Sequence, residues 1–373
     1  MPIHLFVPTY DIDECLAEIR DCLERGWTGA GPKSAAFEAA WRLYTGLPHA
    51  HFLNANTSGL HLALEVFKEI DRWGAGDEVI SSPLTFVASN HAILHAGLEP
   101  VFADIDQYLC LDPEDVERKI TPRTRAVMFV GIGGNTGQFS RVQTICRERG
   151  LRLILDAAHM AGSRLDGQTP SADANVYSFQ AVKNLPTADA GMICFEDALA
   201  DAMARKMSWM SISRDTYSRT QDAGSYRWLY DVEYVGHKYN GNDIMASIGL
   251  VQLRRLEADN AYRRQLSQWY AEALAEADQV GVIGTAPGCI SSQHLFQVQV
   301  NNRDALMVEL NAQEIYPGVH YRDNRDYRMY RRAIDDCPIS SRMSGRLIST
   351  PLHIKLTHDD VLRVAEAVIA GAE

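Results

Sequence analysis

Short apolar segments alternate with longer amphipathic segments between residues 55 and 195, and this alternation limits the fold more than any other feature of the chain. Strands are predicted at residues 78–81, 100–104, 126–131, 152–156, 175–179 and 191–195. Helices are predicted between them at residues 57–70, 88–96, 113–119 and 142–149. Such alternation is typical of an α/β domain with a mostly parallel sheet between two layers of helices. In sheets of this kind, ligands bind at the carboxyl ends of the strands.

The segments on either side of this region are mostly helical. The predicted helices lie at residues 11–26, 33–45, 243–276, 304–313 and 358–371, with a strand at residues 294–300. We therefore predict a large α/β domain, residues 1–254, which includes the N-terminal helices, and a smaller α+β domain, residues 255–373.

The composition and charge of the chain argue against a nucleic-acid-binding protein and against a membrane protein. The chain has 373 residues, of which 46% are hydrophobic, and a formal net charge of −12. So acidic a chain gains nothing from counterion release on nucleic acid, and we expect no nucleic-acid partner. No segment approaches the roughly 18 apolar residues of a membrane helix. The N-terminus also lacks a signal-peptide pattern, so we expect a cytoplasmic protein without a membrane partner.

The seven cysteines give no sign of a disulfide framework or a metal site. Their number is odd, their spacings are wide, and no C-x-x-C pair occurs. These properties argue against both arrangements. We expect no bound metal.

Two ionisable residues follow predicted buried strands. Asp156 ends the strand at residues 152–156, and Lys183 comes 27 residues later, after the strand at residues 175–179. An aspartate in such a place often caps a helix or forms a structural ion pair, and a loop lysine is usually a solvated surface charge. A catalytic lysine must instead be desolvated, so that its pKa falls and its neutral amine can attack a carbonyl. The apolar approach to Lys183 agrees with that requirement.

Two further segments contain residues suited to a phosphate and a planar ring. A turn of small residues at 54–59 opens a predicted helix, where backbone N–H groups and the hydroxyls of Thr57 and Ser58 favour an anion. The same residue types also serve as ordinary helix caps. Phe86 either belongs to the core or lies flat on a bound ring. Together with the lysine and the aspartate, these features supply what pyridoxal 5′-phosphate (PLP) requires.

The order and spacing of these motifs resemble the nucleotide-sugar aminotransferase family of the DegT/StrS type. The resemblance covers nearly the whole chain and implies fold type I of the PLP-dependent transferases, the aspartate aminotransferase fold. No single motif is specific, but the combination is. The segments that carry it are residues 26–32, 37–38, 57–61, 85–97, 100–106, 156–159, 178–184, 190–193, 236–244 and 249–253.

The resemblance implies a role for each of the residues around the cofactor. Lys183 would carry PLP as a Schiff base and then transfer protons, and Asp156 would pair with the pyridine nitrogen. His159 would lie near the phenolic oxygen of the cofactor, and Phe86 would stack on its ring. The phosphate ligands implied are Thr57, Ser58, Ser178 and, from the second subunit of a homodimer with shared active sites, Lys238.

The resemblance also implies the reaction. An amino group would pass from an amino acid, with L-glutamate expected, to a nucleotide-linked keto-sugar, with pyridoxamine phosphate as the intermediate form of the cofactor. The product would serve a bacterial surface polysaccharide or a natural product. The candidates for substrate binding are His320, Tyr321 and Asn240, followed by Trp209, Arg214 and Tyr217.

Three departures from the family pattern bear on the substrate. Many relatives have Asn and Arg where this chain has Lys238 and Asn240, and the Lys-Tyr-Asn version resembles 4-keto-pentose aminotransferases, which favours amination at carbon 4 of the sugar. Gly131 stands where relatives often have a histidine. The turn after Lys183 has fewer glycines than is usual. The nucleotide and the sugar stay open.

Two alternatives share this fold, and two others do not fit the motifs. A deoxysugar dehydratase of the same fold uses pyridoxamine phosphate and carries His where this chain has Lys183. A non-catalytic protein that binds PLP or a nucleotide-sugar would lack Lys183, Asp156 or the phosphate turn. A nicotinamide-binding domain would need G-x-G-x-x-G after its first strand, and a zinc hydrolase would need paired histidines on one helix.

Overall fold

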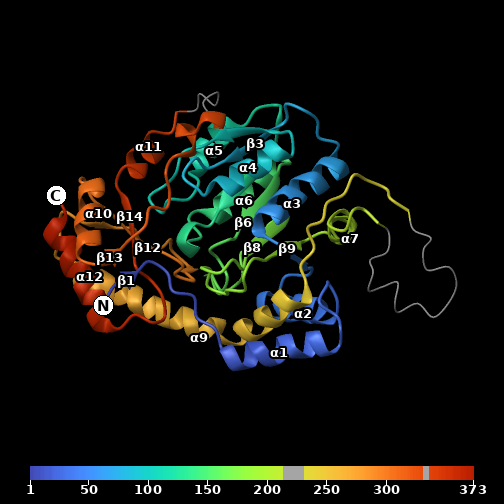
Figure 1. The fold of residues 1–373 in the computed structure, drawn as a ribbon. Helices are drawn as coiled ribbons and strands as arrows, with labels where there is room; N and C mark the ends of the chain where they lie inside the picture. The colour runs from blue at the N-terminus through green and yellow to red at the C-terminus, as the bar shows by residue number, and fades with distance from the viewer. Residues whose placement is uncertain (213–230, 331–335) are drawn as a thin grey trace.

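The centre of the molecule is a seven-stranded sheet with helices on both sides (Figure 1). The computed structural model describes residues 1–212, 231–330 and 336–373. β9 runs antiparallel to both of its neighbours, whereas the other pairs are parallel, which confirms the predicted mixed and mostly parallel sheet. In spatial order the strands are β2 (His51–Leu53), β9 (Gly191–Phe195), β8 (Ala174–Ser178), β6 (Arg152–Asp156), β5 (Thr124–Val130), β3 (Glu78–Ser81) and β4 (Glu99–Phe102).

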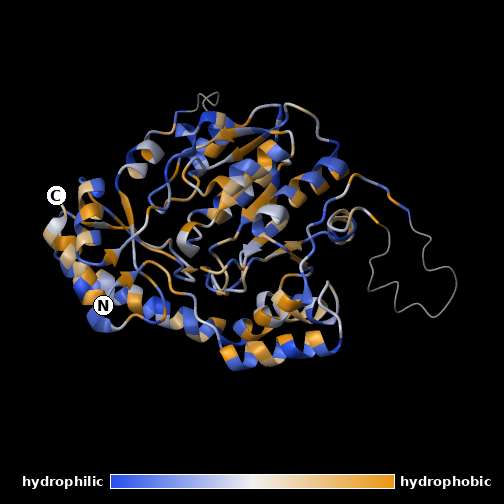
Figure 2. Ribbon diagram, viewed as in Figure 1, coloured by the Kyte–Doolittle hydropathy of each residue, from blue (hydrophilic) through white to orange (hydrophobic). Residues whose placement is uncertain are grey.

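Alternate residues of the central strands face two separate apolar layers. Val127 and Phe129 of β5 belong to one layer, and Ala126 and Met128 belong to the other. Strands covered by helices on both faces are expected to be apolar on both faces, and Figure 2 shows hydrophobic colours on the central strands. The helices of the first layer are α2 (Pro32–Thr45), α5 (Pro113–Lys119), α6 (Phe139–Arg149) and α9 (Asp243–Ala273), and those of the second are α3 (Asn56–Asp71), α4 (Val87–His95) and α7 (Ala198–Met207).

The residues after α9 build a second, smaller core. A three-stranded antiparallel sheet packs with helices α10 and α12 and with the C-terminal half of α9. The N-terminal strand also joins this part, because β1 pairs in parallel with β13. The elements are β10 (Gly281–Val282), β12 (Phe296–Gln299), β14 (Leu347–Thr350), α10 (Arg303–Ala312), α12 (His358–Gly371), β1 (Ile3–His4) and β13 (Ile315–Tyr316).

The predicted segments correspond to observed elements whose ends differ by no more than three residues. The prediction missed β2, α7, β14, helix α11 (Pro338–Ser344) and several two-residue strands, among them β7 (Arg164–Leu165) and β11 (Cys289–Ile290). Helix α1 (Ile12–Glu24) packs against α9, as Figure 1 shows.

The boundary predicted between residues 254 and 255 falls inside α9, which continues without interruption from the first core into the second. The division into two domains at that point stays a prediction. In the described ranges, no helix combines the length and the apolar character that crossing a membrane requires.

Candidate active site

A cavity of about 440 Å³ lies at the carboxyl ends of β5, β6 and β8, where a doubly covered sheet is expected to bind its ligand. We call it the Lys183 pocket. Segments outside the large sheet also line it, because Phe6 follows β1 and His294 precedes β12. Eight of the predicted site residues line this pocket: Thr57, Phe86, Asp156, His159, Ser178, Lys183, His320 and Tyr321.

Asp156, the last residue of β6, is buried and held by three neutral donors. Ser89 donates its hydroxyl to Asp156 Oδ2 at 2.7 Å. The backbone N–H of Ala158 and the side-chain amide of Asn56 donate to Oδ1 at 3.1 and 3.2 Å. Burial raises the pKa of the Asp156 carboxyl, and these hydrogen bonds oppose the rise. The carboxylate is therefore rigidly oriented and has room for a cationic partner in the pocket.

Lys183 lies in the turn between β8 and β9. Its backbone N–H donates to Gln180 O at 2.8 Å, which fixes the turn. Desolvation lowers the pKa of the Lys183 amine to about 8, and the charge of Asp156 opposes this shift. The lysine side chain as a whole is half-buried and lines the same pocket as Asp156. A large fraction of the amine is neutral near pH 8, as a nucleophilic lysine requires.

His159 and Tyr321 lie side by side in the lining of the pocket. The backbone N–H of Gly133 donates to His159 Nδ1 at 3.1 Å, so the proton of the neutral ring is on Nε2. That nitrogen lies 3.2 Å from the hydroxyl oxygen of Tyr321 and donates to it. Burial lowers the pKa of His159 well below its usual value and raises that of Tyr321. The Tyr321 hydroxyl is therefore free to donate its own proton into the pocket.

The predicted phosphate ligands are only partly brought together. Thr57 lines the pocket at the first turn of α3, where Ala55 at the cap position has no polar side chain to bind the first amides of the helix. Ser178, at the end of β8, is buried and accepts the N–H of Gln180 at 3.4 Å. Ser58, half-buried in the same turn of α3, is outside the lining of the pocket within the part of the chain that the structure describes.

Three of the predicted residues lie elsewhere in the same chain. Lys238 places its amine 2.9 Å from the ring centre of Trp209 and does not reach the Lys183 pocket. Asn240 pairs with Leu53 at the edge of the sheet and donates its amide to Gly241 O at 2.9 Å. Trp209 is partly buried beneath Lys238 and is likewise outside the described lining of the pocket. Arg214 and Tyr217 lie outside the described residues.

The sequence interpretation missed several polar residues of the site. Asn56 and Ser89 hold Asp156, and both stand within or just beyond motifs that had been recognised, one position before Thr57 and three positions after Phe86. His294 lies far along the chain at the start of a predicted strand, and only its burial beside His159, with ring centres 4.3 Å apart, brings it into the site. No local pattern around His294 signals this contact.

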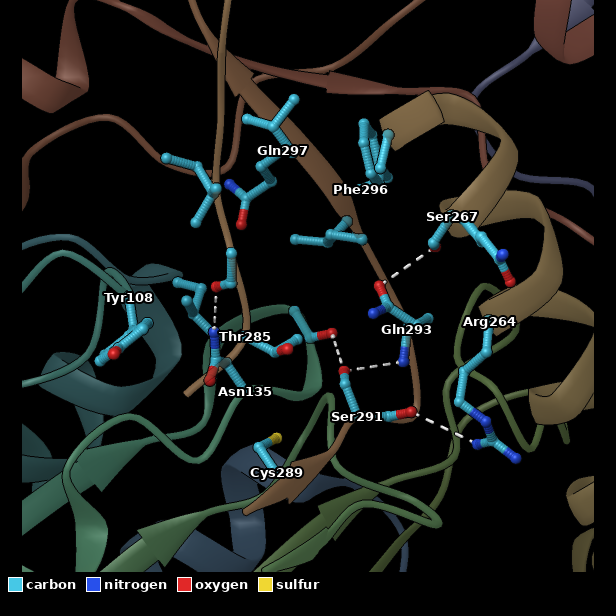
Figure 3. Close-up of a pocket in the computed structure, with 18 of the residues that line it drawn as sticks. Tyr108, Asn135, Arg264, Ser267, Thr285, Cys289, Ser291, Gln293, Phe296 and Gln297 are labelled. Atoms are coloured by element: carbon cyan, nitrogen blue, oxygen red, sulfur yellow. Dashed lines mark hydrogen bonds between the residues drawn. The ribbon is translucent and has the colours of Figure 1, made fainter. Parts of the chain in front are cut away.

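A second cavity, of about 480 Å³, lies behind His159 and is shown in Figure 3. We call it the Arg264 pocket. Most of its polar side chains bind one another or the backbone: Asn135 donates to Gly284 O at 2.9 Å, Ser267 donates to Gln293 at 3.2 Å, and Arg264 donates to Ser291 O at 3.4 Å. Its lining contains no carboxylate among the described residues. It lacks the close pair of amine and carboxylate that makes the Lys183 pocket a candidate active site.

The model of one protein family matches residues 10–369, and its description is the DegT/DnrJ/EryC1/StrS aminotransferase family. The chain belongs to this family. The predicted resemblance to the DegT/StrS type is thereby confirmed, and the motifs around Lys183 and Asp156 lie in the matched region.

Individual proteins are similar to this chain over nearly their full lengths. The spore coat polysaccharide biosynthesis protein SpsC of Bacillus subtilis is 34% identical, over 96% of this chain and 95% of SpsC. The aminotransferase TlmJ of Streptoalloteichus hindustanus is 31% identical with a TM-score of 0.92, over 100% of this chain and 99% of TlmJ. Spr1654 of Streptococcus pneumoniae, solved in its PLP form, is 27% identical with a TM-score of 0.89, over 99% of this chain and 98% of Spr1654.

Proposed function

We propose that this chain is a PLP-dependent aminotransferase that transfers an amino group from an amino acid to a nucleotide-linked keto-sugar. The observation that carries the proposal is the pairing of Lys183 and Asp156 in one buried pocket at the carboxyl edge of the sheet. Membership of an aminotransferase family supports the type of reaction, and the PLP form of a similar protein supports the cofactor.

The residues present fit PLP. Asp156 has three neutral hydrogen-bond donors and no ion-pair partner among the described residues, so a protonated pyridine nitrogen would complete its coordination. The start of α3 and the Thr57 hydroxyl offer donors to a phosphate. Phe86, which is 58% exposed, has a free ring face that a flat cofactor would cover.

PLP, when bound, supplies an electron sink that makes the hydrogen on the amino-bearing carbon acidic. Lys183 would provide the amine that holds the cofactor and the base that takes this hydrogen. Asp156 would hold the pyridine nitrogen in its protonated form. His159 binds the Tyr321 hydroxyl, whose own proton would then be available to a ligand in the pocket.

For the substrates, we propose L-glutamate as the amino donor and a sugar with its keto group at carbon 4 as the acceptor. The Lys-Tyr-Asn sequence at residues 238–240 supports carbon 4. His320 and Tyr321, which line the pocket, are the proposed sugar contacts. Similarity to SpsC supports a role in polysaccharide synthesis, and we propose that this synthesis takes place in the cytoplasm.

We further propose a homodimer with shared sites. Lys238 lies outside the Lys183 pocket of its own chain, which leaves it available to the phosphate in the pocket of a second copy. Three apolar side chains of α1 (Ile12, Leu16 and Leu23) are 57–67% exposed and would gain from burial against a partner.

The test has two steps. First, protein loaded with PLP is reduced with borohydride and digested, and a mass increase is expected on the peptide that contains Lys183. Second, ¹⁵N-labelled L-glutamate and a panel of nucleotide-linked 4-keto and 3-keto sugars are added, and the label is expected in the 4-amino product. No adduct on Lys183 would refute the proposal. A product that loses a hydroxyl and gains no nitrogen would identify a dehydratase instead.

A further inference from the structure

Asn184, the residue after the lysine, is buried and bonded through both ends of its side-chain amide. Its Nδ2 donates to Asn260 Oδ1 on α9 and to Ser292 O, both at 2.7 Å. Its Oδ1 lies 2.9 Å from His294 Nδ1. Asn260 in turn donates to Ala161 O at 2.8 Å, in the turn that follows β6. One buried network therefore joins the lysine turn, α9, the second core and the segment after the aspartate strand.

Two backbone carbonyls determine the direction of every hydrogen bond in this network. A carbonyl can only accept, so Asn260 presents its Nδ2 to Ala161 O, and Asn184 presents its Nδ2 to Ser292 O. Asn184 Oδ1 is then the acceptor facing His294, and His294 must carry its proton on Nδ1. The tautomer, assigned from these partners, leaves Nε2 of His294 unprotonated.

His294 also belongs to a stack of rings on the wall of the Lys183 pocket. Its ring centre lies 4.3 Å from that of His159 and 5.2 Å from that of Phe6. Burial lowers the pKa of both imidazoles well below the usual value, so both are neutral near pH 7. Because Gly133 fixes the proton of His159 on Nε2, the two neighbouring imidazole rings hold opposite tautomers. His159 is a donor at Nε2, and His294 is an acceptor there.

The segment that contains His294 is also hydrogen-bonded to the backbone of His159. Ser292 donates its hydroxyl to His159 O at 2.6 Å, while its own carbonyl accepts from Asn184. The residue before His159 carries the N–H that binds Asp156. Lys183 and Asp156 are thus held relative to each other by residues 292–294, which lie outside the large sheet. Fully satisfied buried networks of this kind specify one arrangement of their members.

We propose that His294 is a positioning residue for Lys183, which acts through Asn184 and holds the lysine turn in register with the aspartate strand. This inference rests on the proposed function, since it assigns a task to His294 in the attachment and release of the cofactor by Lys183. Its consequence is that the rate at which Lys183 captures the cofactor depends on a side chain from the second core. Donation from position 294 to Asn184 Oδ1 is the required feature, rather than the aromatic ring.

Two variants at residue 294 distinguish the role of the hydrogen-bond donor from that of the aromatic ring. Asn can reproduce the Nδ1–H of a histidine, whereas Phe keeps a ring and loses the donor. In stopped-flow mixing of cofactor-free enzyme with PLP, we expect His294→Phe to slow the formation of the Lys183 adduct at least 10-fold. We expect His294→Asn to stay within about 3-fold of wild type. Equal slowing in both variants, or in neither, would overturn the proposal.

A double-mutant cycle tests whether His294 acts through Asn184. Asn184→Ala alone should slow adduct formation, and adding His294→Phe should slow it little further, because the hydrogen-bond partner is already gone. Multiplicative slowing in the double variant would place the effect of His294 elsewhere and contradict the inference.

His51 offers a matched control for general destabilisation. It is buried, with Nε2 2.7 Å from Ser208 and Nδ1 3.0 Å from Glu38, and it lies away from the pocket at the edge strand β2. His51→Phe should lower the unfolding temperature and leave the rate of adduct formation of the folded enzyme unchanged. If it slows adduct formation as much as His294→Phe does, the effect at residue 294 is merely structural.

Failure of the proposed function and failure of this inference give different results. A wild-type protein that forms no adduct refutes the proposed function. An adduct that forms equally fast in wild type and His294→Phe refutes this inference alone.

Discussion

The two cavities behind and in front of His159 have similar volumes, about 480 and 440 Å³, but opposite chemistry. In the Arg264 pocket the polar side chains satisfy one another and the backbone of the connecting segments. In the Lys183 pocket, by contrast, an amine from the turn after β8 and a carboxylate from the end of β6 line the same space, and both are desolvated. The comparison teaches that volume does not identify a reactive site, whereas ionisable groups that burial has shifted from their ordinary pKa do.

The largest expected effect on activity distinguishes Lys183 from Arg264, the cationic residues of the two pockets. Lys183→Ala should reduce kcat by at least ~10³-fold, because the attachment point and the base are both lost. Arg264→Ala removes a cation of the other pocket and should leave kcat within about twofold. Single-turnover rates with the nucleotide-linked keto-sugar measure both. A comparable loss in Arg264→Ala would abolish the distinction between the cavities.

The second effect concerns the carboxylate. Asp156→Asn keeps the size of the side chain and, through its one carbonyl oxygen, the bonds from Asn56 and Ala158, but it removes the charge that would keep the pyridine nitrogen protonated. We expect kcat to fall by roughly 10²–10³-fold, the usual cost of losing one preorganised electrostatic group. Turnover above a tenth of the wild-type value would show that the charge of Asp156 is dispensable.

The third effect is a pH dependence of the lysine. The pKa of Lys183 lies near 8, below the ordinary value of 10.5, so the reactive neutral amine is lost as the pH falls below 8. The rate of adduct formation by cofactor-free enzyme should therefore decrease about tenfold per unit between pH 7 and 6 and reach a plateau above pH 9. Stopped-flow absorbance across this range gives the midpoint. A midpoint above pH 10 would mean that the amine is solvated.

The smallest effect on activity is expected in the Arg264 pocket. Asn135 donates to Gly284 O and accepts from the N–H of Ala286 at 3.1 Å, and Asn135→Ala leaves both backbone groups without that partner. We expect the free energy of unfolding in urea to fall by about 1–3 kcal/mol. The kcat of the folded fraction should stay unchanged, since the task of Asn135 is structural. A change in kcat at constant stability would assign the pocket a part in the reaction.

Much of the large sheet could be predicted because its strands are buried on both faces and read as continuous apolar runs. Strand 152–156 and strand 191–195 were placed with their observed ends. β2 was missed because three residues at a sheet edge offer no periodicity, and its partner β9 lies 140 residues away. Helix α7 did carry a signal, since Asp197 caps its first amides and Ala200, Ala204 and Met207 recur at helical spacing.

The site was predictable where local motifs carry the chemistry. Lys183, Asp156, Phe86 and Thr57 follow strands or open helices, and parallel strand ends meet at one edge. The contacts of His294 depend on how the second core packs against the first, and residue spacing along the chain does not encode that packing. The proposed contribution of Lys238 to a second subunit involves two chains and stays a prediction.

Helix α9 is a structural part of both cores, so the two parts of the molecule depend on one continuous helix. At 31 residues it is a rod of roughly 46 Å, with Ala246 and Leu256 embedded in one core and Leu266 and Tyr270 in the other. A cut at residue 254 would divide α9 within the first core. The second core would then lose the intact helix against which it packs. We therefore expect neither fragment to fold when expressed alone, and the halves to regain solubility only when produced together.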